Sequence, residues 1–119
     1  MALKIANREL EGVAVLALDG RVVLGEETSM LREKVKNLLA EGKKNIVLNL
    51  SNVTQIDSSG LGALVTAYSS AKSQGASLRL CNLGSRFSEM LQVTKLYTVF
   101  EVSDNETDAA RAMVKSASA

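Results

Sequence analysis

The chain has 119 residues, of which 46% are hydrophobic and 3% aromatic, and its formal net charge is +1. This length suits one domain with a real core, and the composition indicates a soluble globular protein rather than a disordered one. No apolar run approaches the roughly 18 residues of a membrane span, and the N-terminal residues show no signal peptide, so membrane insertion is not expected. No basic cluster exceeds Lys43–Lys44 and aromatic side chains are scarce, which argues against direct nucleic-acid binding.

Histidine is absent from the sequence, and Cys81 is the single cysteine. The lack of histidine removes the commonest general base and a common zinc ligand, which disfavours an enzyme without excluding one that uses carboxylates or lysine. We expect no catalytic residue, no metal site, no cofactor and no enzyme activity. One cysteine cannot form an internal disulfide and suggests a reducing compartment, so the cytoplasm is expected. Cys81 lies in a predicted strand, where a core role is expected.

Apolar runs and helical spacings predict nine elements in chain order. They are a strand at 3–6, a strand at 13–18 after a Glu11–Gly12 turn, a helix beginning near 26–29 and ending at Gly42, a strand at 46–50, a helix from Asp57 to Gln74–Gly75, a strand at 78–83, a helix after Gly84, a strand at 99–102, and a helix from an Asp104 cap to about Lys115. The run at 13–18 is continuously apolar, as in a strand buried on both faces, and Asp19–Gly20 is expected to end it. The residues Met30, Met90 and Met113 are predicted to pack inward.

The order ββαβαβαβα, with helices separating buried strands, predicts an α/β fold with parallel pairings. The opening hairpin adds an antiparallel strand, so we expect a mixed β-sheet with packed α-helices. Residues 1–119 are predicted to form a single domain, with residues 116–119 frayed.

The junction at residues 56–64 has the sequence Ile-Asp-Ser-Ser-Gly-Leu-Gly-Ala-Leu. Asp and Ser are preferred helix caps, so a structural cap is the simplest interpretation, and the glycines could permit close helix–sheet packing. A serine nucleophile is disfavoured because no histidine can activate it and the order is not G-x-S-x-G. A nucleotide cradle is weakly supported because Gly60 and Gly62 are only half of a glycine fingerprint. A receiver domain with Asp57 as phosphoacceptor is disfavoured because the expected acidic pair and lysine are missing.

Phosphorylation of a junction serine is the remaining alternative. A phosphate at a helix N-terminus meets free N–H groups and the positive end of the helix dipole, so the fold would stay intact. The added charge of about −1.5 to −2 would make a docking surface centred there strongly anionic. The following helix has a small, weakly polar face that suits docking as well as it suits plain solvation. That face is formed by Gly62, Thr66, Ser69, Ser70 and Ser73.

Residues 48–62, Leu-Asn-Leu-Ser-Asn-Val-Thr-Gln-Ile-Asp-Ser-Ser-Gly-Leu-Gly, closely resemble the signature of STAS-domain anti-sigma factor antagonists. The resemblance covers nearly the whole chain, including the element order and the segment from Leu91 to Leu96, and it implies a single-domain STAS-like fold. Members of this family switch partners. The unphosphorylated form binds an anti-sigma factor that is also a serine kinase and so frees the sigma factor. Phosphorylation by this kinase breaks the complex, and a PP2C-type phosphatase resets it.

The resemblance also implies roles for single residues. The phosphorylated residue would be Ser58, directly after the motif's aspartate, and Asp57 would cap the helix and orient Ser58. Ser59 would be a neighbouring polar contact, while Gly60 and Gly62 would let the kinase come close. The expected partner-binding residues are Asp57, Ser59, Gly60, Gly62, Thr66, Ser69 and Glu26.

The chain departs from the family pattern in one loop. Many members carry an acidic residue three positions after the glycine that matches Gly20, where this chain has Val23, and Glu26 is a candidate substitute. The departure leaves a second function open, that of a STAS interaction subunit of another assembly, such as a lipid-transport ATPase complex or a stress-signalling scaffold, without sigma-factor control. The free chain is expected to be a monomer.

Overall fold

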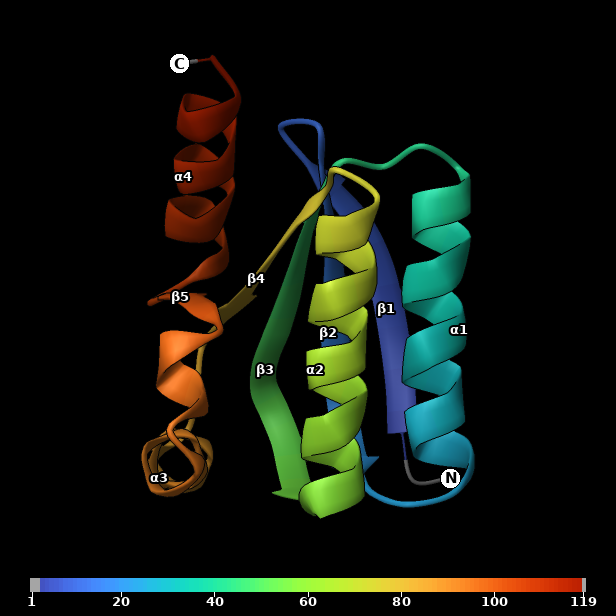
Figure 1. The fold of residues 1–119 in the computed structure, drawn as a ribbon, viewed down its shortest axis with the longest axis vertical. Coiled ribbons are helices and arrows are strands. Elements are labelled where there is room, and N and C mark those ends of the chain that lie inside the picture. Colours follow the sequence, from blue (N-terminus) through green and yellow to red (C-terminus); the bar gives the residue numbers. More distant parts are fainter. Residues whose placement is uncertain (1–2, 119) are drawn as a thin grey trace.

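A computed structural model describes the backbone of residues 3–118 and the side chains of residues 3–113. The predicted order ββαβαβαβα is confirmed, with one short 3₁₀ helix, η1, added before the last strand (Figure 1). The elements are β1 Leu3–Leu10, β2 Val13–Val22, α1 Glu26–Ala40, β3 Asn45–Ile56, α2 Ser58–Ser73, β4 Ser77–Cys81, α3 Ser85–Thr94, η1 Leu96–Thr98, β5 Glu101–Ser103 and α4 Glu106–Ser118.

The five strands form one mixed sheet in the order β1-β2-β3-β4-β5. Strand β1 pairs antiparallel with β2, and the remaining neighbours are parallel. The β1–β2 hairpin turns at Glu11 and Gly12, whose φ angles of 52° and 82° are both positive. Two such residues give a turn whose twist matches that of the flanking strands, so the predicted turn is confirmed.

Both faces of the sheet are covered. On β2, Leu16 and Leu18 belong to the larger core beneath α1, α2 and α3, while Val13 and Val15 belong to a smaller core with Cys81 and residues of α4. Each of these β2 side chains is no more than 1% exposed, which confirms a strand buried on both faces. Figure 1 shows α1 and α2 lying side by side against the sheet.

The strands of the hairpin and of the sheet centre are longer than predicted. Strand β1 continues to Leu10 because it stays paired with β2 along its whole length. Strand β2 does not end at Asp19–Gly20: two register shifts against β3 absorb the irregular backbone at Gly20, whose φ is 122°, and the pairing continues to Val22. Strand β3 accordingly runs to Ile56.

Three other predictions are corrected near the helices. The last strand begins at Glu101 rather than 99 because the N–H groups of Val99 and Phe100 donate to the Leu96 carbonyl and close η1 instead of joining the sheet. Helix α4 is capped by Asn105, not Asp104: the Asp108 N–H donates to Asn105 Oδ1 at 2.9 Å. Met30 is 42% exposed and does not pack inward. Helix α4 runs through Ser118, and the frayed end predicted at 116–119 includes Ala119, which lies outside the described residues.

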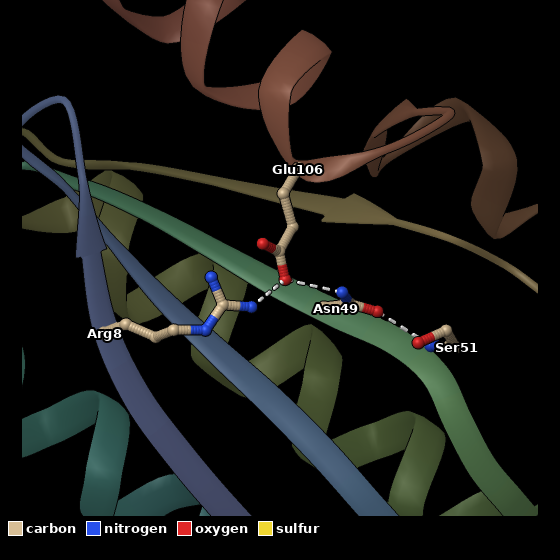
Figure 2. Close-up of polar contacts among 4 residues, drawn as sticks. All are labelled: Arg8, Asn49, Ser51 and Glu106. Atoms are coloured by element: carbon tan, nitrogen blue, oxygen red, sulfur yellow. Dashed lines mark hydrogen bonds and ion pairs between the residues drawn. The ribbon is translucent and has the colours of Figure 1, made fainter.

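A polar cluster joins α4 to the sheet (Figure 2). Glu106 Oε2, in the first residue of α4, accepts hydrogen bonds from Arg8 on β1 and from Asn49 on β3, both at 2.6 Å. Asn49 Oδ1 in turn accepts the Ser51 N–H at 2.9 Å. Partial burial alone would raise the pKa of Glu106, but the bonds from Asn49 and Arg8 outweigh it, so that the pKa lies below its usual range.

Candidate functional site

The start of α2 meets the ends of β2 and β3 at one end of the sheet, at the bottom of Figure 1. Asp57 links these segments through its backbone. Its N–H donates to the carbonyl of Val22, the last residue of β2, at 3.4 Å, and its carbonyl accepts the Leu61 N–H at 2.9 Å. The loop between β2 and α1 passes the same end of the molecule. The sequence motif therefore lies where the β2–α1 and β3–α2 connections meet.

The Asp57 carboxylate accepts one backbone N–H on each oxygen. Oδ1 accepts the Gly60 N–H at 2.8 Å, which confirms the predicted helix cap. Oδ2 accepts the Leu24 N–H at 3.0 Å, from the loop between β2 and α1. The bond from Leu24, followed by the one from Gly60, holds the pKa of Asp57 below its usual range, so the group is ionised at neutral pH. The Leu24 bond spans 33 residues of sequence, and no local pattern could have predicted it.

The two glycines of the motif have different environments. A Cβ on Gly60 would lie 1.9 Å from the Val22 carbonyl oxygen and 2.9 Å from the Ile56 side chain. Gly60 is buried, so the expectation that it lets a partner come close is corrected: the close approach is between α2 and β2 of the same chain. Gly62 is exposed, and a Cβ on it would meet no atom within 4 Å. Of the two, Gly62 alone leaves open room at the surface.

The two serines are also presented differently. Ser58 is the first residue of α2 and is exposed, whereas Ser59 is half-buried. The Ser58 hydroxyl thus lies at the N-terminal end of a 16-residue helix, next to an ionised carboxylate. This end of a helix favours negative charge through its free N–H groups and dipole, so the fold can accept a phosphate at this position.

The outer face of α2 matches the predicted small, weakly polar surface. Gly62, Thr66, Ser69 and Ser73 are exposed, while Ser70 is half-buried. Thr66 and Ser70 also line a groove shared with α1. The inner face carries the buried residues Leu61, Ala63, Leu64, Ala67 and Ala71.

The loop that departs from the family pattern adjoins this site. Val23 is half-buried, and Glu26 is exposed as the first residue of α1. Between them lies Leu24, which is 74% exposed although its backbone is bonded to Asp57. The exposed leucine in the loop that Asp57 holds therefore lies two residues from an exposed carboxylate at the start of α1.

The described part of the chain offers neither a metal centre nor a membrane span. Within residues 3–118, no group of three or more acidic, cysteine or histidine residues is placed to hold a metal ion. Over the same residues, no helix is both long and apolar enough to cross a membrane. The candidate site is the junction of β2, β3 and α2, where the Asp57 contacts lie.

Comparison with known proteins identifies the fold family. Residues 4–109 match the STAS domain family model. An anti-sigma F factor antagonist of Paenibacillus polymyxa is 29% identical over 111 residues, which cover 92% of this chain and 93% of that protein. An anti-sigma-B factor antagonist of Bacillus subtilis is 35% identical over 74 residues, which cover 62% of this chain and 67% of that protein.

Solved structures show the same architecture. The anti-sigma factor antagonist SpoIIAA in its unphosphorylated form superposes with a TM-score of 0.70 at 17% identity, covering 96% of this chain and 98% of that one. The phosphorylated form of Bacillus SpoIIAA also gives a TM-score of 0.70, at 18% identity, covering 93% and 99%. At these identities the likeness establishes the fold, and together with the family match it shows that the chain belongs to the STAS domain family.

Proposed function

We propose that this protein is an anti-sigma factor antagonist controlled by phosphorylation. In its unphosphorylated form it binds an anti-sigma factor that is also a serine kinase, and the sigma factor is released. The kinase phosphorylates Ser58, the complex dissociates, and a PP2C-type phosphatase restores the binding form. Support comes from the Paenibacillus and Bacillus relatives, which are named as antagonists of anti-sigma factors.

The observation that carries this proposal is the exposed Ser58 hydroxyl at the start of a helix already fixed by Asp57. A kinase can reach this hydroxyl without unfolding the chain. Phosphorylation would place a charge of about −1.5 to −2 beside the ionised Asp57 carboxylate. A partner surface that fits a neutral serine would then face two adjacent anions, and desolvating both would oppose binding.

The partner surface would extend from Ser58 in two directions. Along α2 it would use Gly62, Thr66 and Ser69, whose exposed face carries no charge. Toward α1 it would use Glu26, in place of the acidic residue that many family members carry at the position of Val23. Asp57 and Ser59 would shape the centre, and Gly60 would act by letting α2 approach β2 rather than by direct contact.

This function needs no catalytic group, metal or cofactor in the chain, and we assign it no enzyme activity. Sigma factors act in the bacterial cytoplasm, where a single reduced cysteine is also stable, so we place the protein there. We assign the free chain a monomeric state and no direct contact with nucleic acid.

The proposal is tested with Ser58→Asp and wild-type chains as paired baits in lysate of the source organism. Ser77→Asp is the matched control, because it puts the same charge on an exposed serine at the start of β4, at the opposite end of the parallel strands from Ser58. We expect wild type and Ser77→Asp to capture an anti-sigma serine kinase and Ser58→Asp to lose it. Incubating the captured kinase with ATP should label Ser58, as read by mass spectrometry. Equal capture of the kinase by all three baits would refute the switch.

One observation favours a second function. Val23 occupies a position that is acidic in many antagonists, and it is half-buried. If Glu26 does not replace that acid, the STAS domain would serve as an interaction subunit of a lipid-transport ATPase complex or a stress-signalling scaffold. Capture of the same transporter or scaffold subunit by wild-type and Ser58→Asp baits would establish this alternative.

A further inference from the structure

The exposed leucine beside the site is held in a fixed position. Leu24 is 74% exposed, and Met30, in the second turn of α1, is 42% exposed. Both side chains line one shallow depression next to the start of α1, and the lining also includes the charged residues Glu26, Arg32 and Glu33. Single exposed apolar residues are common on protein surfaces, so exposure alone would mean little. Here two of them share one depression, and one of them is attached to the phosphoacceptor junction.

The attachment runs through the Asp57 carboxylate. Oδ2 holds the Leu24 N–H at 3.0 Å while Oδ1 holds the Gly60 N–H at 2.8 Å. On the other side of Leu24, the buried Thr28 hydroxyl donates to the Gly25 carbonyl at 3.1 Å. The backbone of Leu24 is therefore fixed from both sides, and an exposed side chain on a fixed backbone loses less conformational freedom when a partner covers it.

We propose that Leu24 is the apolar anchor of the Ser58 interface and that Asp57 is its positioning residue. The inference rests on the proposed function. The partner that covers Leu24 is the same anti-sigma kinase, which would present an apolar pocket beside its binding site for Ser58. Continuity supports this assignment. The residue that precedes Ser58 is hydrogen-bonded to Leu24, and the neighbouring face of α2 carries no charge that would oppose apolar contact.

The arrangement gives Asp57 two separable roles. As a helix cap it needs one oxygen, and as a positioning residue it needs the second. Asp57→Asn keeps one acceptor oxygen but turns the other into an NH₂ group, which cannot accept the Leu24 N–H. The variant should therefore free the loop while leaving a cap at α2. If Asp57 served only as a helix cap, Asp57→Asn would weaken binding to the same extent in the wild-type chain and in the Leu24→Ala chain.

The test measures calorimetric affinity for the purified anti-sigma serine kinase of the source organism. Leu24→Ala should weaken binding about tenfold or more, because alanine has less apolar surface than leucine for the kinase to bury in the complex. Val93→Ala is the matched control: this side chain is 83% exposed on α3, and binding should stay within about twofold. Because both sites are exposed, the midpoints of urea unfolding should not change.

A double-mutant cycle tests the positioning role. In the Asp57→Asn background, Leu24→Ala should cost no more than about twofold, because the leucine is no longer held in place. Additive losses would overturn the role of Asp57, and a Leu24→Ala chain that binds as tightly as Val93→Ala would overturn the anchor. Both results leave the proposed function standing if Ser58→Asp still abolishes binding. A wild-type chain that does not bind the kinase would overturn the proposed function and this inference together.

Discussion

At the scale of single residues, the site depends on how closely two backbones approach. Gly60 faces the Val22 carbonyl so closely that the fold has no room for a Cβ at this position. Two residues further along, Gly62 faces open space. The two glycines look equivalent in the motif, yet one serves the contact between α2 and β2 and the other leaves the outer surface flat.

Alanine substitutions should separate these glycines. Gly60→Ala would put a Cβ 1.9 Å from a backbone oxygen, so α2 must move and the free energy of unfolding should fall by about 2 to 4 kcal/mol. Gly62→Ala lies in an exposed helical position, where alanine should raise it by up to about 1 kcal/mol. Urea denaturation followed by circular dichroism measures both. Equal stability of the two variants would mean that α2 is not tightly packed on β2.

The same residues show what local sequence can and cannot predict. The Asp57 cap follows from residue types within four positions, and the burial of Cys81 follows from the strand that carries it. The Asp57–Leu24 bond and the contact of Gly60 with Val22 join residues that lie more than 30 positions apart. Such contacts depend on the register of β2 against β3, which contains two shifts that no periodicity reveals.

At the scale of elements, α4 covers its face of the sheet differently from the other helices. The continuous apolar run at 13–18 predicted two buried faces, but which helix covers the second face is a matter of topology. The smaller core contains Ala109, Ala110 and Met113 of α4. Beside it, Glu106 bonds to Arg8 and Asn49. The Arg8–Glu106 pair spans 98 residues, a separation that no local sequence pattern can bridge.

Neutralising Glu106 should weaken the attachment of α4. Because the pKa of Glu106 is lower in the folded chain than in the unfolded chain, its contribution to stability is present above the unfolded value of about 4.3 and is lost as pH falls through the folded value. Glu106→Gln should lower the free energy of unfolding at pH 7 by about 1 to 2 kcal/mol. Stability of the variant should then fall less steeply than that of wild type as pH drops below about 4.3.

The control for this prediction is Glu9→Gln. The Glu9 side chain is 61% exposed, and its Oε2 lies 3.7 Å from Lys43 Nζ. Loss of this exposed ion pair should change the free energy of unfolding by no more than about 0.5 kcal/mol. Urea titrations at a series of pH values compare the three proteins. Parallel pH profiles for wild type and Glu106→Gln would show that the Glu106 bonds do not contribute to stability.

The reactivity of the Cys81 thiol measures how often α4 detaches from its face of the sheet. The thiol lies in the core that α4 covers, and burial, together with the nearby charge of Glu106, raises its pKa to about 12. At pH 8 the native thiol is therefore protonated and covered, and Ellman's reagent should react with it only when α4 opens or the chain unfolds. Glu106→Gln should accelerate labelling and Glu9→Gln should not. Rapid labelling of the native wild-type chain would contradict this.

At the scale of the whole molecule, the proposed switch at Ser58 lies apart from the two cores of the sheet. The junction that carries Ser58 lies at the end of the sheet, whereas the large buried side chains lie along the strand centres and the inner faces of the helices. A change of charge at Ser58 therefore acts on the surface. Such an arrangement allows binding to be turned off without loss of the folded state, as the proposed function requires.

This separation predicts that Ser58→Glu folds as well as wild type. The exposed position costs no core contact, and attraction of the new carboxylate to the α2 N-terminus offsets its repulsion from Asp57, so the free energy of unfolding should change by no more than about 0.5 kcal/mol. Urea denaturation and circular dichroism measure this, with kinase binding measured on the same preparation. A stable Ser58→Glu chain that has lost the kinase would assign the loss to surface charge. If the variant were instead destabilised by more than about 2 kcal/mol, unfolding would account for lost binding, and Ser58 would have a structural role at the start of α2 rather than act as a switch.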